Sequence, residues 1–248
     1  MKQVEREHIL YGFHSAEEAI RNEPRKINQI WTLQGFRLPR LRKLLDEAHQ
    51  HRIPIKIVDK AALNRLAGNS HHQGLVLEVS PYRYHDADAL LETIAPHALF
   101  CILDEIQDAT NLASLIRSME GAGVTGAFIP ERRSAAVTGT THRLSAGALA
   151  HVKIARVPNL AMLIDRMHES GIRVICADAS ASRLWYEADY QGPIAILVGN
   201  EQKGVRRLLK EKSDELVRIP MRGELQSLNV SVAAAVLLYE ALRQRGNR

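Results

Sequence analysis

The stretch Leu99-Phe-Cys-Ile-Leu103, closed by Asp104, decides the fold class of this chain. Five apolar residues in a row are too few for a helix and are typical of a buried strand. Residues 111–121 repeat leucine and methionine at helical spacing, and residues 124–129 form a second apolar run. A strand, a helix and a second strand in this order predict a parallel strand pair.

The same alternation continues toward the end of the chain. Further strands are expected at 152–157, 173–177, 194–198 and 216–219, and a last helix at 230–243. Strands separated by helices predict an α/β domain with a mostly parallel sheet covered on both faces. Ligands of such sheets bind beyond the carboxyl ends of the strands, so the residues that directly follow each strand carry the most functional information.

A smaller block of alternating helices and strands precedes this domain. Its strands are expected at 29–33, 54–58 and 73–79. The segment that follows contains Pro81 and Pro96 around a polar middle, which is typical of a linker. The length of 248 residues fits one large or two modest domains. We therefore expect a first domain at 1–80, a linker at 81–97 and a second domain at 98–248.

The net charge of +5 is unevenly distributed along the chain. Residues 1–80 contain 13 Lys and Arg against 9 Asp and Glu, a net of +4, whereas residues 81–248 contain 20 against 19. Six of the 11 histidines also lie in the first part. A basic block attached to a nearly neutral one suggests that the first domain binds an anionic partner such as a nucleic acid, although so small an excess also arises by chance.

Cysteine usage and hydropathy exclude several classes of protein. Cys101 and Cys176 lie far apart in apolar stretches, so we expect two reduced, buried thiols and no metal site. The longest apolar run, 230–239, is half of the roughly 20 residues that a membrane-spanning helix needs. The N-terminus lacks the apolar core of a secretory signal, and we expect a cytoplasmic protein without membrane contact.

Two glycine patterns resemble nucleotide-binding motifs but lack the required context. Gly121-Ala-Gly-Val-Thr-Gly126 follows a helix and precedes a strand, the reverse of a dinucleotide fingerprint. We expect a glycine helix cap and a tight turn there. Gly199 and Gly204 have the spacing of a phosphate loop, but Val205 and Arg206 replace its Lys and Ser/Thr. Nucleoside triphosphate hydrolysis is therefore disfavoured, although the loop follows a strong strand and is well placed to bind a ligand.

Three stretches place polar residues directly after an apolar strand. They are Ile102-Leu-Asp-Glu-Ile-Gln-Asp-Ala-Thr-Asn-Leu-Ala-Ser-Leu-Ile-Arg117, Ile196-Leu-Val-Gly-Asn-Glu-Gln-Lys-Gly204 and Ile219-Pro-Met-Arg-Gly-Glu-Leu-Gln-Ser-Leu-Asn-Val-Ser231. Their order and spacing resemble the three motifs of the SPOUT RNA methyltransferases, SpoU/TrmH branch, and Ser227-Leu-Asn-Val-Ser-Val-Ala is the most specific segment. The resemblance covers nearly the whole chain, and the layout is similar to RlmB-type members, which methylate a guanosine ribose 2′-hydroxyl of 23S ribosomal RNA.

The resemblance implies a fold, a cofactor and partners. The second domain would be a SPOUT domain with a deep trefoil knot, and S-adenosyl-L-methionine would bind in that knot. The first domain would be an RNA-binding α/β domain of the L30e/L7Ae type, in agreement with its charge. The family is dimeric with its active site at the subunit interface, so we expect a homodimer that acts on 23S ribosomal RNA or on the assembling large subunit.

The family's functional residues map onto positions of this chain. The residues expected to be catalytic are Asn111, Arg117, Glu201, Ser227 and Asn229. Those expected to contact the cofactor are Val198, Gly199, Ile219, Leu228 and Asn229. Candidate RNA contacts in the first domain are Arg37, Arg40, Arg42, Lys43 and His72. Departures from the family pattern are modest: Ala109-Thr110 before Asn111, Asn200 after Gly199, and Gln202-Lys203.

Each position also has a simpler interpretation. Asn111 could cap its helix, Arg117 could be an exposed helix residue, and Ser227 or Asn229 could cap the last helix. The basic cluster at 37–43 could be a solvated helix face, and His72 a turn or core residue. The alternatives to a ribosomal RNA target are a transfer RNA and a non-catalytic RNA-binding or ribosome-assembly protein.

Overall fold

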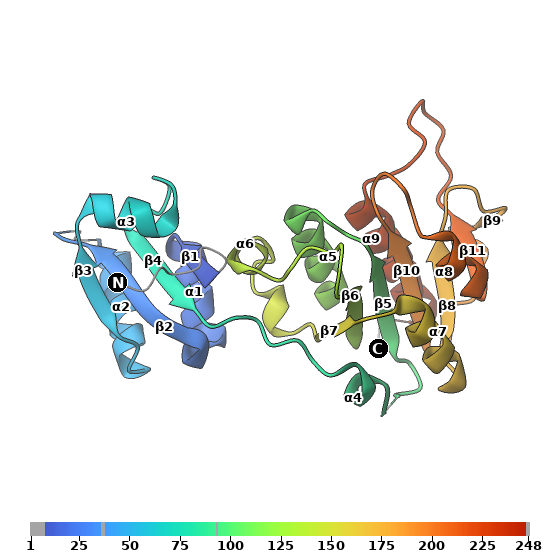
Figure 1. Cartoon of the computed structure of the whole chain (residues 1–248), viewed down its shortest axis with the longest axis horizontal. Coiled ribbons are helices and arrows are strands. Elements are labelled where there is room, and N and C mark those ends of the chain that lie inside the picture. Colours follow the sequence, from blue (N-terminus) through green and yellow to red (C-terminus); the bar gives the residue numbers. More distant parts are fainter. Residues whose placement is uncertain (1–7, 36–37, 93, 247–248) are drawn as a thin grey trace. The chain divides into compact units, whose positions relative to one another are not determined.

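The structure is a computed structural model, and it describes residues 8–35, 38–92 and 94–246. The chain forms two compact units (Figure 1). The first unit comprises residues 1–83 together with 136–150, and the second comprises 84–135 together with 151–248. The sequence did not indicate that residues 136–150, expected within the second domain, would pack with the first unit.

The first unit is a four-stranded sheet covered by helices on both faces. Its strands are β1 (Ile9–Tyr11), β2 (Ile27–Leu33), β3 (Ile55–Val58) and β4 (Leu75–Val79), in the order β1-β4-β2-β3. Only β2 and β3 pair in parallel, whereas β4 is antiparallel to both of its neighbours. The helices from this part of the chain are α1 (Phe13–Asn22), the 3₁₀ turn η2 (Pro24–Lys26), α2 (Pro39–Gln50) and α3 (Lys60–Ala67).

Two apolar clusters lie on opposite faces of this sheet. Ile20 of α1 and Leu44 of α2 pack with Leu10, Ile30 and Leu77 of the strands. The side chains that alternate with them pack around Leu63 of α3. The segment 136–150 adds α6 (Gly139–Leu144) and the 3₁₀ turn η3 (Ala148–Ala150), and α6 contacts β1.

The second unit is a seven-stranded sheet in which every strand pair is parallel. Its strands are β5 (Leu99–Asp104), β6 (Gly126–Pro130), β7 (Ile154–Val157), β8 (Arg173–Ala177), β9 (Arg183–Leu184), β10 (Ile194–Gly199) and β11 (Glu215–Arg218), in the order β7-β6-β5-β10-β8-β11-β9. The predicted parallel sheet is therefore confirmed. The two-residue β9 and the three-residue β1 were not predicted, because runs so short carry no periodicity.

Helices cover both faces of this larger sheet (Figure 1). One face packs against α4 (Ala87–Glu92), α7 (Leu160–Glu169) and α8 (Arg207–Lys212) through an apolar cluster. On the other face, α5 (Ala109–Gly121) and α9 (Val230–Arg245) pack against each other, and α9 contacts β10. The 3₁₀ turn η4 (Trp185–Glu187) follows β9. Cys101 and Cys176 are both buried as free thiols, as predicted.

The first glycine pattern forms the tight turn that the sequence predicts. Helix α5 ends at Gly121 and β6 begins at Gly126. Between them, Gly123 adopts a φ of +68°, a left-handed conformation that favours glycine. The helix cap itself is Ala122. No described helix is long and apolar enough to cross a membrane.

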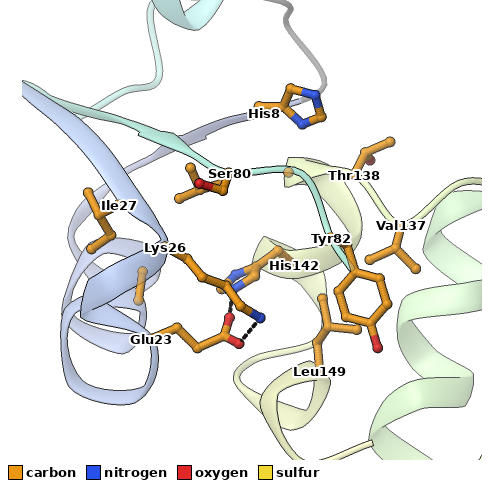
Figure 2. Close-up of a pocket in the computed structure, with 13 residues that line it drawn as sticks. His8, Glu23, Lys26, Ile27, Ser80, Tyr82, Val137, Thr138, His142 and Leu149 are labelled. Atoms are coloured by element: carbon orange, nitrogen blue, oxygen red, sulfur yellow. Dashed lines mark hydrogen bonds and ion pairs between the residues drawn. The ribbon is translucent and has the colours of Figure 1, made fainter. Parts of the chain in front are cut away.

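A partly buried ion-pair cluster attaches the segment 136–150 to the first unit (Figure 2). Glu23 follows α1 and forms an ion pair with Lys26, and the Nε2 atom of His142 lies 3.3 Å from its Oε2 atom. The hydrogen bond from His142 and the contact with Lys26 lower the pKa of Glu23 from 4.5 to about 2, although burial opposes this shift. The Glu23 carboxylate therefore stabilises the docked segment only in its charged form.

We predict that Glu23→Gln lowers the free energy of unfolding at pH 7 and weakens its dependence on acid pH. Because the pKa of Glu23 is depressed to about 2 in the folded state, its contribution is complete above pH 4.5 and is lost as the pH falls toward 2. Urea unfolding at a series of pH values measures this. The matched control is Asp46→Asn on the exposed side of α2. Parallel pH curves for the wild type and Glu23→Gln would contradict the assignment.

Candidate functional site

The carboxyl ends of β5 and β10 meet at one edge of the larger sheet. Gly199, the last residue of β10, pairs with Asp104, the last residue of β5. Beside them lies an open pocket, the main pocket, with about 1100 Å³ of empty space. Its walls come from three parts of the chain, 177–179, 198–210 and 217–233. This is the place where the sequence predicts a ligand.

Gly199 is required by the close approach of the loop that follows it. A Cβ atom at this position would lie 2.3 Å from the backbone nitrogen of Val205 and 2.4 Å from the carbonyl carbon of Gly204. Both contacts are to backbone, which cannot move away as the tip of a side chain can. The loop 200–205 can fold back over the end of β10 only because residue 199 has no side chain.

Asn200 determines the shape of this loop. Its Oδ1 atom accepts hydrogen bonds from the backbone N–H groups of Gln202 and Lys203, at 3.0 and 3.1 Å. Its Nδ2 atom donates to the carbonyl oxygen of Glu105 at 3.0 Å and so attaches the loop to the end of β5. Asn200, which departs from the family pattern, therefore holds the loop in place.

Asp104 and Arg206 form a second contact that holds this loop at the end of β5, and it was not predicted from the sequence. The Asp104 side chain is fully buried, and its Oδ2 atom accepts from the backbone N–H of Arg206 at 2.9 Å. Its Oδ1 atom accepts from the Nε and Nη2 atoms of Arg206, at 2.8 and 2.6 Å. A buried carboxylate needs such a partner. A carboxylate at the end of an apolar strand indicates that Asp104 needs a partner. The sequence does not identify that partner, because Arg206 lies 102 residues away.

Asn111 connects all three motif stretches. Its Nδ2 atom donates to Oε1 of Glu201 at 2.7 Å, and its Oδ1 atom accepts from Nδ2 of Asn229 at 2.9 Å. The Oδ1 atom of Asn229 in turn accepts from the backbone N–H of Ser231 and caps α9. The structure therefore brings together three of the five predicted catalytic residues.

The helix-capping interpretation holds for Asn229 but is wrong for Asn111. The cap of α5 is Asp108, whose Oδ1 atom accepts from the backbone N–H groups of Thr110 and Asn111. These hydrogen bonds lower the pKa of Asp108. Because Asp108 takes this role, the side chain of Asn111 is available to bridge the other two stretches.

The remaining predicted site residues lie in two groups. Val198, Gly199, Ile219, Ser227 and Leu228 line the main pocket, together with Glu201. Asn111, Glu201 and Asn229 line a neighbouring hollow with about 950 Å³ of empty space. We call it the acidic hollow, because its wall also contains Glu105 and Asp108 and its one cation is Lys203.

Arg117 lies apart from both spaces. It is exposed on α5 and lines neither the main pocket nor the acidic hollow. Six residues along a helix correspond to a rise of about 9 Å and a rotation of about 240°, so Arg117 faces away from Asn111. No hydrogen bond or ion pair joins its side chain to another residue in the described part of the chain.

The candidate RNA contacts of the first unit differ in accessibility. Arg42 and Lys43 are exposed on α2, whereas Arg40 forms a two-pronged ion pair with Glu17 at 2.6 and 2.7 Å. His72 is buried: its Nδ1 atom accepts from the N–H of Gly74, and its Nε2 atom lies 2.8 Å from Asn64. Burial lowers the pKa of His72. This geometry favours the turn interpretation of His72 over an RNA contact. Arg37 lies outside the described residues.

Comparison with known proteins decides the family. The SpoU rRNA Methylase family model matches residues 98–239, and the model for RNA 2′-O ribose methyltransferase substrate binding matches residues 9–85. The chain belongs to the SpoU rRNA methylase family. The resemblance predicted from the sequence is thereby confirmed, and with it the enzyme class, an S-adenosylmethionine-dependent RNA 2′-O-ribose methyltransferase.

Full-length relatives and a solved structure extend this result. A putative TrmH family tRNA/rRNA methyltransferase of Staphylococcus haemolyticus is 37% identical over 96% of each chain. The 23S rRNA (guanosine-2′-O-)-methyltransferase RlmB of Shewanella oneidensis is 36% identical over 98% of this chain and 99% of its own. The SpoU methyltransferase AviRb of Streptomyces viridochromogenes, solved with AdoMet, has the same fold, with a TM-score of 0.79, 24% identity, and 96% and 89% of the two chains covered.

We predict that Gly199→Ala weakens S-adenosylmethionine binding by roughly tenfold or more, or about 1.4 kcal/mol. The added Cβ would force the loop 200–205 away from β10 and deform the wall of the main pocket. Calorimetric titration measures the affinity, and a thermal melt shows whether the variant is folded. The control is Gly223→Ala, where a Cβ meets open space and φ is not positive. Equal affinities for the two variants would refute this role of Gly199.

Proposed function

We propose that this chain transfers the methyl group of S-adenosylmethionine to a ribose 2′-hydroxyl of RNA, and that its target is a guanosine of 23S ribosomal RNA. The observation that carries the proposal is the bridge from Asn111 to Glu201 and Asn229, which joins the three motif stretches beside the main pocket. The guanosine target is supported by the Shewanella oneidensis relative, a 23S rRNA (guanosine-2′-O-)-methyltransferase.

The main pocket suits the cofactor by its lining. Its walls combine strand-end backbone with apolar side chains, Val198, Ile219 and Leu228, and with the hydroxyl of Ser227. Apolar walls with a few placed polar groups are typical of a small-molecule site. When bound, the cofactor supplies a methyl group activated by a sulfonium. The protein then has to align that group with the ribose oxygen and remove the hydroxyl proton.

Asn111 and Asn229 position Glu201 at the boundary of the two spaces. Glu201 lines both the main pocket and the acidic hollow, so its carboxylate faces the place where a ribose would approach the methyl donor. The hydrogen bond from Asn111 fixes one carboxylate oxygen. We assign Glu201, Asn111 and Asn229 to the orientation of the acceptor, and Ser227 to the cofactor side.

Arg117 acts on the site of a second copy. A guanidinium holds its proton too strongly to be a good base, so we assign Arg117 to the orientation of the ribose hydroxyl or of a neighbouring phosphate. Its exposed position, away from the spaces lined by its own Asn111, supports a homodimer with composite sites. The proposal includes the trefoil knot, the L30e/L7Ae-like first domain at 1–80, the linker at 81–97, the catalytic domain at 98–248 and a cytoplasmic location.

Ribose methylation mapping tests the function. We expect one guanosine of 23S ribosomal RNA to lose its 2′-O-methyl group in cells that lack the protein, and to regain it with purified protein and S-adenosylmethionine. A loss confined to transfer RNA would support the second candidate target, since the Staphylococcus haemolyticus relative is named a tRNA/rRNA methyltransferase. Unchanged methylation in both RNAs would refute the proposal and leave a role in RNA binding alone.

We predict that Arg117→Ala lowers methyl transfer by a factor of about 10² to 10⁴ while S-adenosylmethionine affinity stays nearly unchanged. The affinity should stay nearly unchanged because Arg117 does not line the main pocket, the proposed cofactor site. Radioactive methyl transfer and calorimetry measure the two quantities. Unchanged turnover would remove Arg117 from the site.

Mixing two impaired variants, assayed at an S-adenosylmethionine concentration too low for Gly199→Ala to bind, tests whether Arg117 acts across the dimer. Arg117→Ala keeps an intact main pocket, and Gly199→Ala keeps an intact Arg117. If the site is composite, a mixed dimer contains one complete site, and activity returns when the two proteins are unfolded and refolded together. If Arg117 serves its own chain, the mixture stays inactive. Each variant refolded alone is the control.

A further inference from the structure

A second hollow adjoins the acidic hollow and carries the opposite charge. It has about 670 Å³ of empty space and is lined by Glu105, Asn200, Lys203, Gly204, Val205, Arg206, Arg207 and Lys210. We call it the basic hollow, because four of its eight lining residues are cations and one is an anion. The two hollows share Glu105, Asn200 and Lys203. Lys203 also lines the main pocket, so it stands where all three spaces meet.

The cations of the basic hollow differ in how far they are already engaged. Arg206 is held by the buried Asp104, and Lys210 lies 2.7 Å from Asp178. Among the described residues, Arg207 pairs only with Glu211, one helical turn away, and its side chain is 91% exposed. An exposed pair of this kind contributes little energy and is readily exchanged.

Lys203 is the cation with the most available charge. Its side chain is exposed and has no hydrogen-bond or ion-pair partner within 8–35, 38–92 and 94–246. Its backbone is fixed, however, because its N–H donates to Oδ1 of Asn200 at 3.1 Å. The base of the side chain therefore has a defined position while the ammonium group remains free to meet an anion.

The chemistry of the acceptor requires an anion site close to the reacting ribose. In an RNA strand the carbon next to the 2′-hydroxyl carries the 3′-phosphodiester, so a site for an internal ribose has to accept that phosphate as well. The acidic hollow repels it through Asp108 and Glu201, whereas Glu105 is paired with Arg133 and Arg206, and Lys203 is the one cation among its lining residues. A phosphate beside the target ribose is therefore drawn to the Lys203 corner.

We propose that the RNA backbone next to the target ribose binds in the basic hollow. Lys203 neutralises the phosphate adjacent to the methylated ribose, and Arg207 contacts a neighbouring phosphate. Arg206, held in place by Asp104 and 3.7 Å from Glu105, adds positive charge to the wall between them. This inference rests on the proposed RNA methyltransferase function and specifies where the strand leaves the site.

Binding of an unstructured RNA at several salt concentrations tests the proposal, because phosphate contacts are read from the salt dependence of affinity. The probe is a fluorescent uridylate oligonucleotide, which offers phosphates without a guanine. Each phosphate contact on single-stranded RNA contributes a slope of about 0.7 in log affinity against log salt, or about fourfold at 0.15 M salt. We expect Lys203→Ala and Arg207→Ala each to lose one such contact, and therefore about fourfold in affinity. The double variant should lose about 15-fold in affinity.

Two controls accompany these variants. Lys153→Ala removes an exposed lysine just before β7, at the opposite, amino-terminal edge of the parallel sheet, and it should bind RNA as the wild type does. Lys203→Arg keeps the charge and should retain most of the affinity. Calorimetry with S-adenosylmethionine should give the wild-type affinity for Arg207→Ala, because Arg207 does not line the main pocket, and it measures any contribution of Lys203 to the wall of that pocket.

Two results would overturn the proposal. One is a salt dependence in Lys203→Ala and Arg207→Ala that equals that of Lys153→Ala. The other is a loss of S-adenosylmethionine affinity in Lys203→Ala with RNA binding unchanged, which would assign Lys203 to the main pocket. Failure of the enzyme function is a separate outcome: the wild type would then transfer no methyl group, whatever the salt dependence of the variants.

Discussion

The side chain of Asn111 donates one hydrogen bond to Glu201 and accepts another from Asn229, residues that lie 90 and 118 positions away. Neither bond could form unless β5 and β10 were neighbours with their carboxyl ends level. The pairing of Gly199 with Asp104 provides that alignment. A slip of one residue in this register would move each strand's side chains to the opposite face and separate the three groups. The geometry of the site therefore depends on the register of one central strand pair.

The loop between β10 and α8 forms a wall of the main pocket, and the position of this loop depends on the strand register. Gly199 allows the loop to fold back, Asn200 closes it, and Asp104 anchors its far end through Arg206. These contacts use the ends of β5 and β10 and backbone N–H groups of the loop. A change of charge at an exposed loop residue such as Lys203 can therefore leave the wall that supports it undisturbed.

Sequence patterns predicted the elements that are long and periodic. The strands at 99–103 and 194–198 and the helix from 111 were expected within one or two residues of their observed bounds, because a buried parallel strand is a continuous apolar run. The motif stretches also identified Asn111, Glu201 and Asn229 before their contacts were known. In these cases the information is local, and a short stretch of chain contains all of it.

Long-range partners could not be predicted in this way. The ion pair of Asp104 with Arg206 joins residues 102 positions apart, and no local pattern distinguishes Arg206 from an exposed arginine. The packing of residues 136–150 with the first unit depends similarly on the pairing of His142 with Glu23, 119 positions earlier. The sequence around His72 was ambiguous, because a histidine two residues before a glycine suits both a turn and a ligand contact. Its burial decides between them.

Net charge is a poor guide to where a polyanion binds on this protein. Residues 81–248 sum to a charge of only +1, which indicates no anionic partner. Within that nearly neutral part, however, carboxylates gather around Asn111 and cations gather around Gly204, on hollows that share Lys203. The donor is a sulfonium, and the acceptor is a neutral ribose hydroxyl flanked by an anionic phosphodiester. Adjacent hollows of opposite sign let the ribose lie beside Glu201 while its phosphate is drawn to the cations around Lys203, whereas a uniformly acidic site would repel the phosphate and a uniformly basic one the sulfonium in the adjoining main pocket.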